Sequence, residues 1–149
     1  MSAKFRVRNA EWAADALKLR HVRRSVFIVE QQVPEHLEWD EADSNCVHAI
    51  AEDESGNPIA TGRLLEDGHI GRIAVLAEWR SRGVGAALFE YLIGVADQRG
   101  HRELLLNAQT HALGFYARYG FVPVGAEFIE AGIAHRIMRR LSVADATLG

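Results

Sequence analysis

Two glycines and two arginines fall together in residues 80–87 (RSRGVGAA). A helix that begins here presents several backbone N–H groups without intrahelical partners, and its dipole adds partial positive charge. Gly83 and Gly85 remove side chains that would keep a ligand off this backbone, while Arg80 and Arg82 add positive charge. The segment predicts a site for a diphosphate or another anion; the plainer alternative is a tight strand-to-helix turn.

Two common nucleotide sites do not fit this segment. A nucleoside triphosphate loop needs Gly-Lys-Ser/Thr, and no such triplet follows the glycines. A dinucleotide fingerprint needs a third Gly or Ala at position 88, where the chain has Leu88. It also needs a parallel strand–helix–strand unit, whereas the pattern before residue 80 predicts antiparallel strands.

Apolar periodicity predicts the elements that must position this turn, and they form a mixed α/β (α+β) domain with helices packed on one sheet. Strands are predicted at residues 5–7, 47–52, 59–65, 69–75, 104–106, 121–124 and 134–139. Helices are predicted at residues 11–27, from residue 84 to a stop at Gly100, and at residues 112–119. The three strands within residues 47–75 read as an antiparallel meander with a hairpin turn at Asp67-Gly68.

Residues 33–43 are predicted to form an irregular acidic loop. Five carboxylates lie within nine of these residues, namely Glu35, Glu38, Asp40, Glu41 and Asp43. The plain interpretation is a solvated loop. The functional alternative is a loop that attracts a cationic amine.

Composition restricts the class of protein. The 149 residues suit a single domain spanning 1–149, with a frayed tail at 142–149. A net charge of -3 gives no bulk basic surface for nucleic acid, and no apolar run is long enough for a membrane span. The single cysteine, Cys46, allows no internal disulfide and favours a reducing, cytoplasmic compartment. The histidines show no metal-ligand spacing, so no metal site is predicted.

Two motifs in this order resemble those of the GCN5-related N-acetyltransferase (GNAT) superfamily. Arg80-x-x-Gly83-x-Gly85 matches its acetyl-CoA motif Gln/Arg-x-x-Gly-x-Gly/Ala. Residues 109–121 (QTHALGFYARYGF) are similar to its later pattern Asn-x-x-Ala-x-x-Leu/Phe-Tyr-x-x-x-Gly-Phe, with Gln109 in place of Asn. The segments VFIVEQQVP and EAGIAHRIMRR, together with the acidic loop, resemble the small bacterial ElaA-like and YjcF-like branch.

The resemblance implies a GNAT-like acyl-CoA N-acyltransferase fold, with a mainly antiparallel central sheet, splayed central strands at 69–75 and 103–107, and flanking helices. Acetyl-CoA would lie between these strands as the acetyl donor, and an amine would be the acceptor. The backbone N–H groups implied to hold the diphosphate are those of Arg82, Gly83, Val84, Gly85 and Ala86. The pantetheine arm would pair with the backbone of Ile73, Ala74 and Val75. Arg80 and Gln109 complete the implied cofactor site, and homodimers are common in the family.

The resemblance also implies an N-acetyltransferase in which a neutral amine attacks the thioester directly. Tyr116 occupies the family's proton-donor position, although a tyrosine on a short helix is otherwise a core aromatic. The general base that takes the proton of the amine has three candidates, namely Glu30, His111 and His135. Their plain alternatives are a Glu30 pair with Arg23 or Arg24, a capping His111, and a satisfied core His135. Two alternatives to N-acetyl transfer remain. One is a non-catalytic module that binds CoA or a partner, and the other is transfer of an acetyl group to oxygen or of a longer acyl group.

Overall fold

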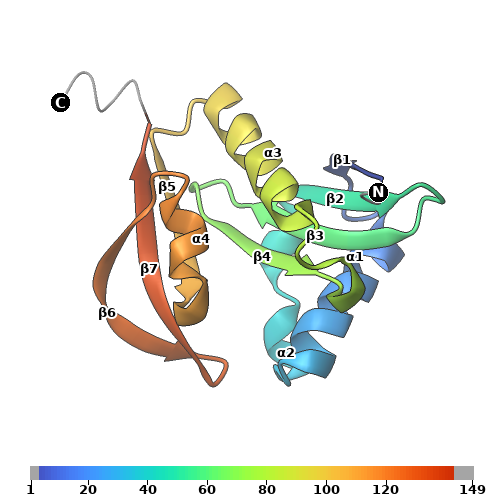
Figure 1. Ribbon diagram of the computed structural model, residues 1–149, viewed down its shortest axis with the longest axis horizontal. Helices are drawn as coiled ribbons and strands as arrows, with labels where there is room; N and C mark the ends of the chain where they lie inside the picture. Colours follow the sequence, from blue (N-terminus) through green and yellow to red (C-terminus); the bar gives the residue numbers. More distant parts are fainter. Residues whose placement is uncertain (1–3, 143–149) are drawn as a thin grey trace.

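Seven strands within residues 4–142 form two antiparallel sheets (Figure 1). The structure is a computed structural model of the chain, and it describes residues 4–142. The first sheet has the order β1-β2-β3-β4, with β1 at Phe5–Ala10, β2 at Val47–Asp53, β3 at Pro58–Leu64 and β4 at Ile70–Val75. The second has the order β5-β7-β6, with β5 at Glu103–Gln109, β6 at Val122–Glu130 and β7 at Ile133–Leu141. The predicted mixed α/β class is confirmed.

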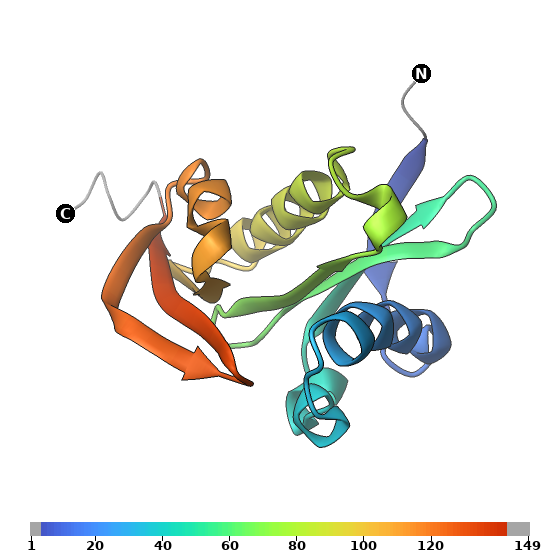
Figure 2. The ribbon, with the colours of Figure 1, turned by 60° about the horizontal axis from the view of Figure 1, so that its bottom comes forward.

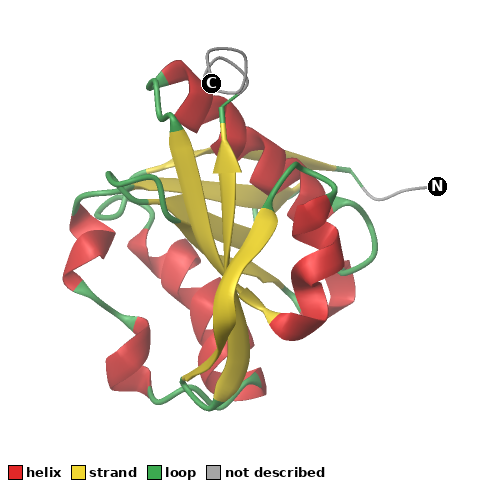
Figure 3. Cartoon of the chain, turned by 90° about the vertical axis from the view of Figure 1, so that its left-hand side faces the viewer, coloured by secondary structure: helices red, strands yellow, loops and turns green. Residues whose placement is uncertain are grey.

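The two sheets meet at a single fork between β4 and β5. His69 and Leu105 form one parallel bridge, and the Leu105 N–H donates to the Gly68 carbonyl at 3.1 Å. Past this bridge β4 and β5 belong to different sheets, so each presents a backbone edge to the space between them. Figure 3 views this arrangement from the side of the three-stranded sheet. The predicted splay of the central strands is therefore confirmed.

The helices are α1 at Ala16–Arg23, α2 at Glu35–Glu38, α3 at Val84–Gln98 and α4 at Leu113–Ala117. Helices α1 and α3 cover the two faces of the first sheet, and α4 packs against β5 and β6 of the second. β3 packs against α3 on one face and α1 on the other, and Figure 2 shows α3 and α4 on the side opposite α1 and α2. Short 3₁₀ turns occupy Glu41–Ser44, Ala77–Trp79 and Thr110–Ala112. Within residues 4–142, no helix is both long and apolar enough to cross a membrane.

The first helix differs from its predicted span of 11–27. It begins at Ala16 and continues beyond α1 as a π-helical segment, Arg24–Glu30. A wider helical turn changes the spacing of apolar side chains, so a search at the α-helical period misses this extension. The extension places Glu30 at the end of the helix, where the chain enters the site described below.

The helix predicted from residue 84 is confirmed, and it carries the core. Its buried face consists of Val84, Leu88, Phe89, Leu92 and Ala96. These side chains pack against β2 and β3 and against Phe121 and Met138 of the second sheet. Helix α3 therefore packs against both sheets and sets how they lie relative to each other.

The last two strands are longer than the predicted 121–124 and 134–139, and Ala131-Gly132 forms the turn between them. A bulge between Val124 and Phe128 bends β6, with Gly125 at a φ of +77°. The predicted tail at 142–149 lies outside the described residues apart from Ser142.

The prediction of an irregular, solvated loop at 33–43 is wrong for its regular turns and for two of its five carboxylates. Glu38 is 2% exposed and Asp43 is 1% exposed, and helix α2 and a 3₁₀ turn order the segment. These carboxylates belong to an ionic cluster that consists of Arg23, Glu38, Asp40, Asp43, Arg63 and Arg72. Arginines already pair with the buried carboxylates Glu38 and Asp43, so these two cannot attract a cationic amine, while Glu35, Asp40 and Glu41 are exposed as a solvated loop predicts.

Arg23 and Arg63 make the short contacts of the ionic cluster. Arg23 Nε donates to Glu38 Oε2 and its Nη1 to Asp43 Oδ1, both at 2.7 Å. Arg63 binds Asp40 through both Nη atoms at 2.7 and 2.8 Å, and its Nη1 also donates to Asp43 Oδ1 at 2.8 Å. The hydrogen bonds from Arg63 lower the pKa of Asp40 to about 2.

We expect Asp43→Asn to destabilise the fold by about 3–5 kcal/mol, because it leaves buried arginines without a full counter-charge. Urea unfolding at pH 7 measures this free energy. Glu35→Gln is the control, since Glu35 forms an exposed pair with Arg24 and its loss should leave the urea midpoint unchanged. Equal midpoints for Asp43→Asn and the wild type would contradict the structural role of the cluster.

The same cluster predicts a loss of stability in acid. Burial alone would raise the pKa of Asp43, but hydrogen bonds and charge from Arg23 lower it below 3.8. A carboxylate whose pKa is lower in the folded state stabilises the fold above its unfolded pKa and loses this effect as pH falls. With Asp40 titrating at about 2, the unfolding free energy should fall between about pH 4 and pH 2.

Candidate active site

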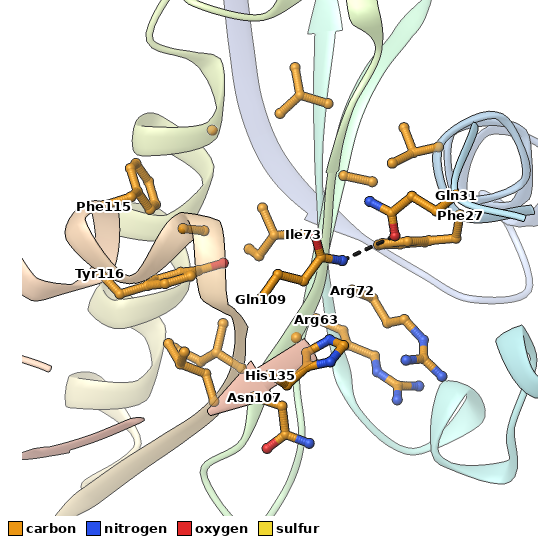
Figure 4. A pocket seen from close by; sticks show the side chains of 18 of the residues that line it. Phe27, Gln31, Arg63, Arg72, Ile73, Asn107, Gln109, Phe115, Tyr116 and His135 are labelled. Carbon is orange, nitrogen blue, oxygen red and sulfur yellow. Dashed lines mark hydrogen bonds between the residues drawn. The ribbon is translucent and has the colours of Figure 1, made fainter. Parts of the chain in front are cut away.

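A cleft of about 790 Å³ opens between β4 and β5 (Figure 4). The two strands form its walls, the π-helical segment closes one side and α4 closes the other. The turn before α3 follows β4 in the chain and contributes Arg80 and Ser81 to the lining, and the first turn of α3 contributes Gly85. The fork thus creates a cavity with a helix N-terminus at one end.

The turn before α3 has the geometry that its glycines predict. Gly83 is the N-cap residue and has a φ of +81°, in the left-handed region that favours glycine. The first intrahelical bond runs from the Ala87 N–H to the Gly83 carbonyl at 3.1 Å, so the N–H groups of residues 84–86 have no carbonyl one turn back. A Cβ at Gly83 would meet nothing within 4 Å. The backbone at this helix end is therefore open to an approaching anion.

The arginines of the turn have different neighbours. Arg82 is exposed and stacks over the Trp79 ring at 5.1 Å. Arg80 Nε donates to the Val75 carbonyl at 3.0 Å, and its Nη2 donates to Glu30 Oε1 at 2.7 Å. Arg80 therefore joins the turn to the edge of β4 and to the end of the π-helical segment.

The plain alternative of a Glu30 pair with an arginine is confirmed, but the partner is Arg80 and not Arg23 or Arg24. Arg23 is taken by the ionic cluster and Arg24 by Glu35. The Glu30 and Arg80 side chains are both more than one third exposed, and water reaches the pair. Glu30 lines the cleft, but its carboxylate is engaged by a cation.

Tyr116 lies on α4 with its ring in an aromatic group that supports the cleft wall. The ring meets Phe89 edge-on at a centroid distance of 5.2 Å and Phe115 at 5.1 Å. Figure 4 shows its hydroxyl pointing into the cleft toward Gln109. Burial raises the pKa of Tyr116 above its ordinary value of 10, so the phenol is protonated at neutral pH.

Gln109 and His135 lie opposite each other on β5 and β7 and both line the cleft. Gln109 Nε2 donates to Gln31 Oε1 at 3.0 Å, which links β5 to the end of the first helix. His135 is 7% exposed, its Nδ1 lies 2.7 Å from the Ile133 carbonyl, and its ring stacks on Phe128. Because a carbonyl only accepts, a neutral His135 carries its proton on Nδ1 and leaves the Nε2 lone pair free.

The remaining predicted residues lie around the same cleft. Ile73, Ala74 and Val75 line it along β4, and the exposed His111 lines it from the 3₁₀ turn before α4. Four predicted residues of the turn are not part of the cleft lining, namely Arg82, Gly83, Val84 and Ala86. The cleft lining also includes four residues that were not predicted from the sequence, namely Gln31, Arg63, Arg72 and Asn107.

Comparisons with known proteins agree with this geometry. Residues 13–142 match the family model described as Acetyltransferase (GNAT) domain. The Bacillus subtilis protein named uncharacterized N-acetyltransferase YjcF is 37% identical over 137 residues, which cover 89% of this chain and 95% of that protein. Among solved structures, an acyl-CoA N-acyltransferase from Pseudomonas aeruginosa is 31% identical with a TM-score of 0.82, covering 92% of this chain and 99% of that one.

Two further structures extend the comparison. Escherichia coli ElaA is 25% identical with a TM-score of 0.81, covering 92% of this chain and 99% of its own. A GNAT family acetyltransferase from Elizabethkingia anophelis, solved with acetyl-CoA bound, shares the fold at 15% identity and a TM-score of 0.70, covering 93% and 98% of the two chains. With a forked sheet, a glycine turn at its cleft and a family model that matches most of its length, the chain belongs to the GNAT acetyltransferase family.

Proposed function

We propose that the protein transfers an acetyl group from acetyl-CoA to the amine of a small molecule or peptide. The observation that carries this proposal is one cleft lined both by the start of α3, through Arg80, Ser81 and Gly85, and by Tyr116. Acetyl-CoA carries a thioester at one end and a diphosphate further along the molecule. A cleft with a proton donor for the departing thiolate and a site for an anion suits such a molecule.

The fork offers a path for acetyl-CoA. We place the diphosphate on the backbone N–H groups of residues 82–86, with Arg80 beside it, and the pantetheine arm along the free edge of β4 at residues 73–75. An edge strand provides unpaired N–H and C=O groups of the kind that a pantetheine amide can pair with. The acetyl-CoA bound by the Elizabethkingia anophelis protein supports this choice of donor. Gln109 would contact the cofactor from the opposite strand.

The reaction proceeds by direct attack. The neutral amine nitrogen bonds to the thioester carbon, and a backbone N–H near Val75 stabilises the resulting oxyanion. The C–S bond then breaks, and the departing thiolate takes the phenol proton of Tyr116. The nitrogen loses its extra proton to a base, which leaves the acetamide and free CoA as products.

We propose His135 as that base. Its Nδ1 contact with the Ile133 carbonyl and its stacking on Phe128 hold the ring in place, with Nε2 free to accept a proton. Glu30 is less suited because its carboxylate is paired with Arg80. His111 lies exposed at the rim of the cleft, where no such contact among residues 4–142 orients its ring.

We expect His135→Gln to lower kcat/KM by about 100-fold, the usual range for a positioned acid or base. Steady-state rates of thiol release at pH 7 measure this loss. His111→Gln is the matched histidine variant, and a larger loss there than at His135 would assign the base to His111 instead.

The activity itself is tested by free-thiol release from acetyl-CoA across a panel of amines, with a thermal-shift measurement of acetyl-CoA binding beside it. Acetylation of at least one amine class, confirmed by the mass of the product, is the expected result. Acetyl-CoA binding without thiol release from any amine would instead identify a CoA-binding module.

A further inference from the structure

Arg72 occupies an irregular position in β4. The β3–β4 register shifts between Thr61 and Arg63, so β4 carries one extra residue at this point. Arg72 has a φ of +52°, in the left-handed region that non-glycine residues rarely adopt. Such strained positions cluster at ligand sites, where a bulge re-aims a side chain. The bulge sends the Arg72 side chain to the lining of the cleft.

Arg72 makes only long contacts with the ionic cluster. Its Nε lies 3.3 Å from Glu38 Oε2 without forming a hydrogen bond, and its Nη2 lies 3.6 Å from Asp40 Oδ2. Its Nη2 also donates to the Leu37 and Glu38 carbonyls, both at 3.3 Å. Charge-assisted bonds are ordinarily near 2.7–2.9 Å, so a large part of the Arg72 donor capacity is unused.

The carboxylates beside Arg72 are already bound by the other arginines. Arg23 holds Glu38 at 2.7 Å, and Arg63 holds both oxygens of Asp40. Burial lowers the pKa of the Arg72 guanidinium, and the charges of Glu38 and Asp40 do not fully offset this because Arg63 and Arg23 act in the same direction as burial. An arginine does not lose its proton in a protein, so its under-compensated charge favours an incoming anion.

Arg72 lies in the part of the cleft that the proposed acetyl-CoA site leaves for the acceptor. Val75 lies three positions further along the strand, about 10 Å away, so Arg72 is distant from the turn that we assign to the diphosphate. Figure 4 shows Arg63 and Arg72 on one side of the cleft, Phe115 and Tyr116 on the other, and His135 between them. The lining carboxylates are engaged elsewhere, Glu30 with Arg80 and Glu130 with Asn107.

We propose that Arg72 binds an acidic group of the acceptor, so that the substrates are amines that carry a carboxylate or a phosphate. This inference rests on the proposed acetyl transfer, because it assigns the acceptor half of the same cleft. The fork of the guanidinium matches the planar pair of oxygens on a carboxylate and two oxygens of a phosphate. Arg72 is then a specificity-determining residue that positions the amine for the base.

The test compares matched probes that differ only in the acidic group. Isothermal titration of the CoA-saturated protein uses β-alanine against β-alaninamide and phosphoethanolamine against ethanolamine, which separates a carboxylate from a phosphate as the recognised group. We expect the acidic member of at least one pair to bind about 10-fold to 100-fold more tightly, as one charge-assisted contact provides. Arg72→Gln should abolish this difference, and Arg72→Lys should retain part of it.

Two controls keep the result interpretable. Arg24→Gln removes an equal charge outside the cleft and should leave the preference unchanged, while an unaltered Kd for CoA in Arg72→Gln establishes that this variant is folded. Equal binding within both pairs, including no detectable binding, overturns the proposal, as does an undiminished preference in Arg72→Gln. An Arg72-dependent preference without thiol release from any amine would leave the acidic-group site standing and contradict acetyl transfer alone.

Discussion

Gly85→Glu should weaken acetyl-CoA binding by at least about 100-fold, since it combines a filled site with like-charge repulsion, each costing more than about 1 kcal/mol. Gly85 lies in the first turn of α3 and lines the cleft. A carboxylate there would occupy the space of the diphosphate and repel it. Isothermal titration with acetyl-CoA measures the loss directly.

Gly85→Ala is the matched control for this substitution. A Cβ at this position would lie 3.5 Å from Val75 Cγ2, an ordinary van der Waals contact, so the helix should accept alanine without strain. We expect Gly85→Ala to keep its affinity within a few-fold and both variants to unfold at similar urea concentrations. Wild-type affinity in a folded Gly85→Glu variant would place the diphosphate elsewhere.

Tyr116→Phe should lower kcat by about 100-fold while the Kd for acetyl-CoA stays nearly the same. The substitution removes a proton donor and keeps the aromatic contacts with Phe89 and Phe115. Because burial raises the pKa of Tyr116 above 10, the wild-type donor stays protonated at neutral pH, and its deprotonation should slow the reaction only above about pH 10. Single-turnover thiol release from the pre-bound acetyl-CoA complex measures the chemical step.

Tyr119→Phe provides a control on the same aromatic group. Tyr119 meets Phe89 edge-on at 5.0 Å, but its hydroxyl donates to Glu90 at 3.1 Å and is not part of the cleft lining. Its removal should leave kcat unchanged. If the two variants lost activity equally, or if Tyr116→Phe kept full activity, Tyr116 would be a packing residue and the proton donor would lie elsewhere.

Local patterns predicted the parts of the site that neighbours in sequence build. The glycines before α3 require a particular backbone, and the apolar stripe that follows requires a helix, so both could be identified from the residues themselves. The resemblance to the GNAT family predicted that three residues distant in sequence serve one site, namely Tyr116, Gln109 and His135. The fork at His69 and Leu105 then places them around one cleft.

The ionic cluster could not be predicted, because its pairs join residues far apart in the chain. Five neighbouring carboxylates look like a solvated loop until Arg23 and Arg63 approach them from α1 and β3. The same reason applies to Glu30 and Arg80, which are 50 residues apart. The bulge at Arg72 is an irregularity of strand pairing, and a run such as Ile-Gly-Arg-Ile-Ala-Val carries no sign of which residue will be displaced.

The most direct measurement is a crystal structure of the protein with acetyl-CoA. We expect diphosphate oxygens within about 3 Å of the backbone nitrogens of residues 83–86, the hydrogen-bond distance for an amide donor. The thioester should lie between the edge of β4 and the Tyr116 hydroxyl. A diphosphate bound away from this helix end, with the nitrogens of residues 83–86 facing only solvent, would contradict the assignment of the cleft to acetyl-CoA.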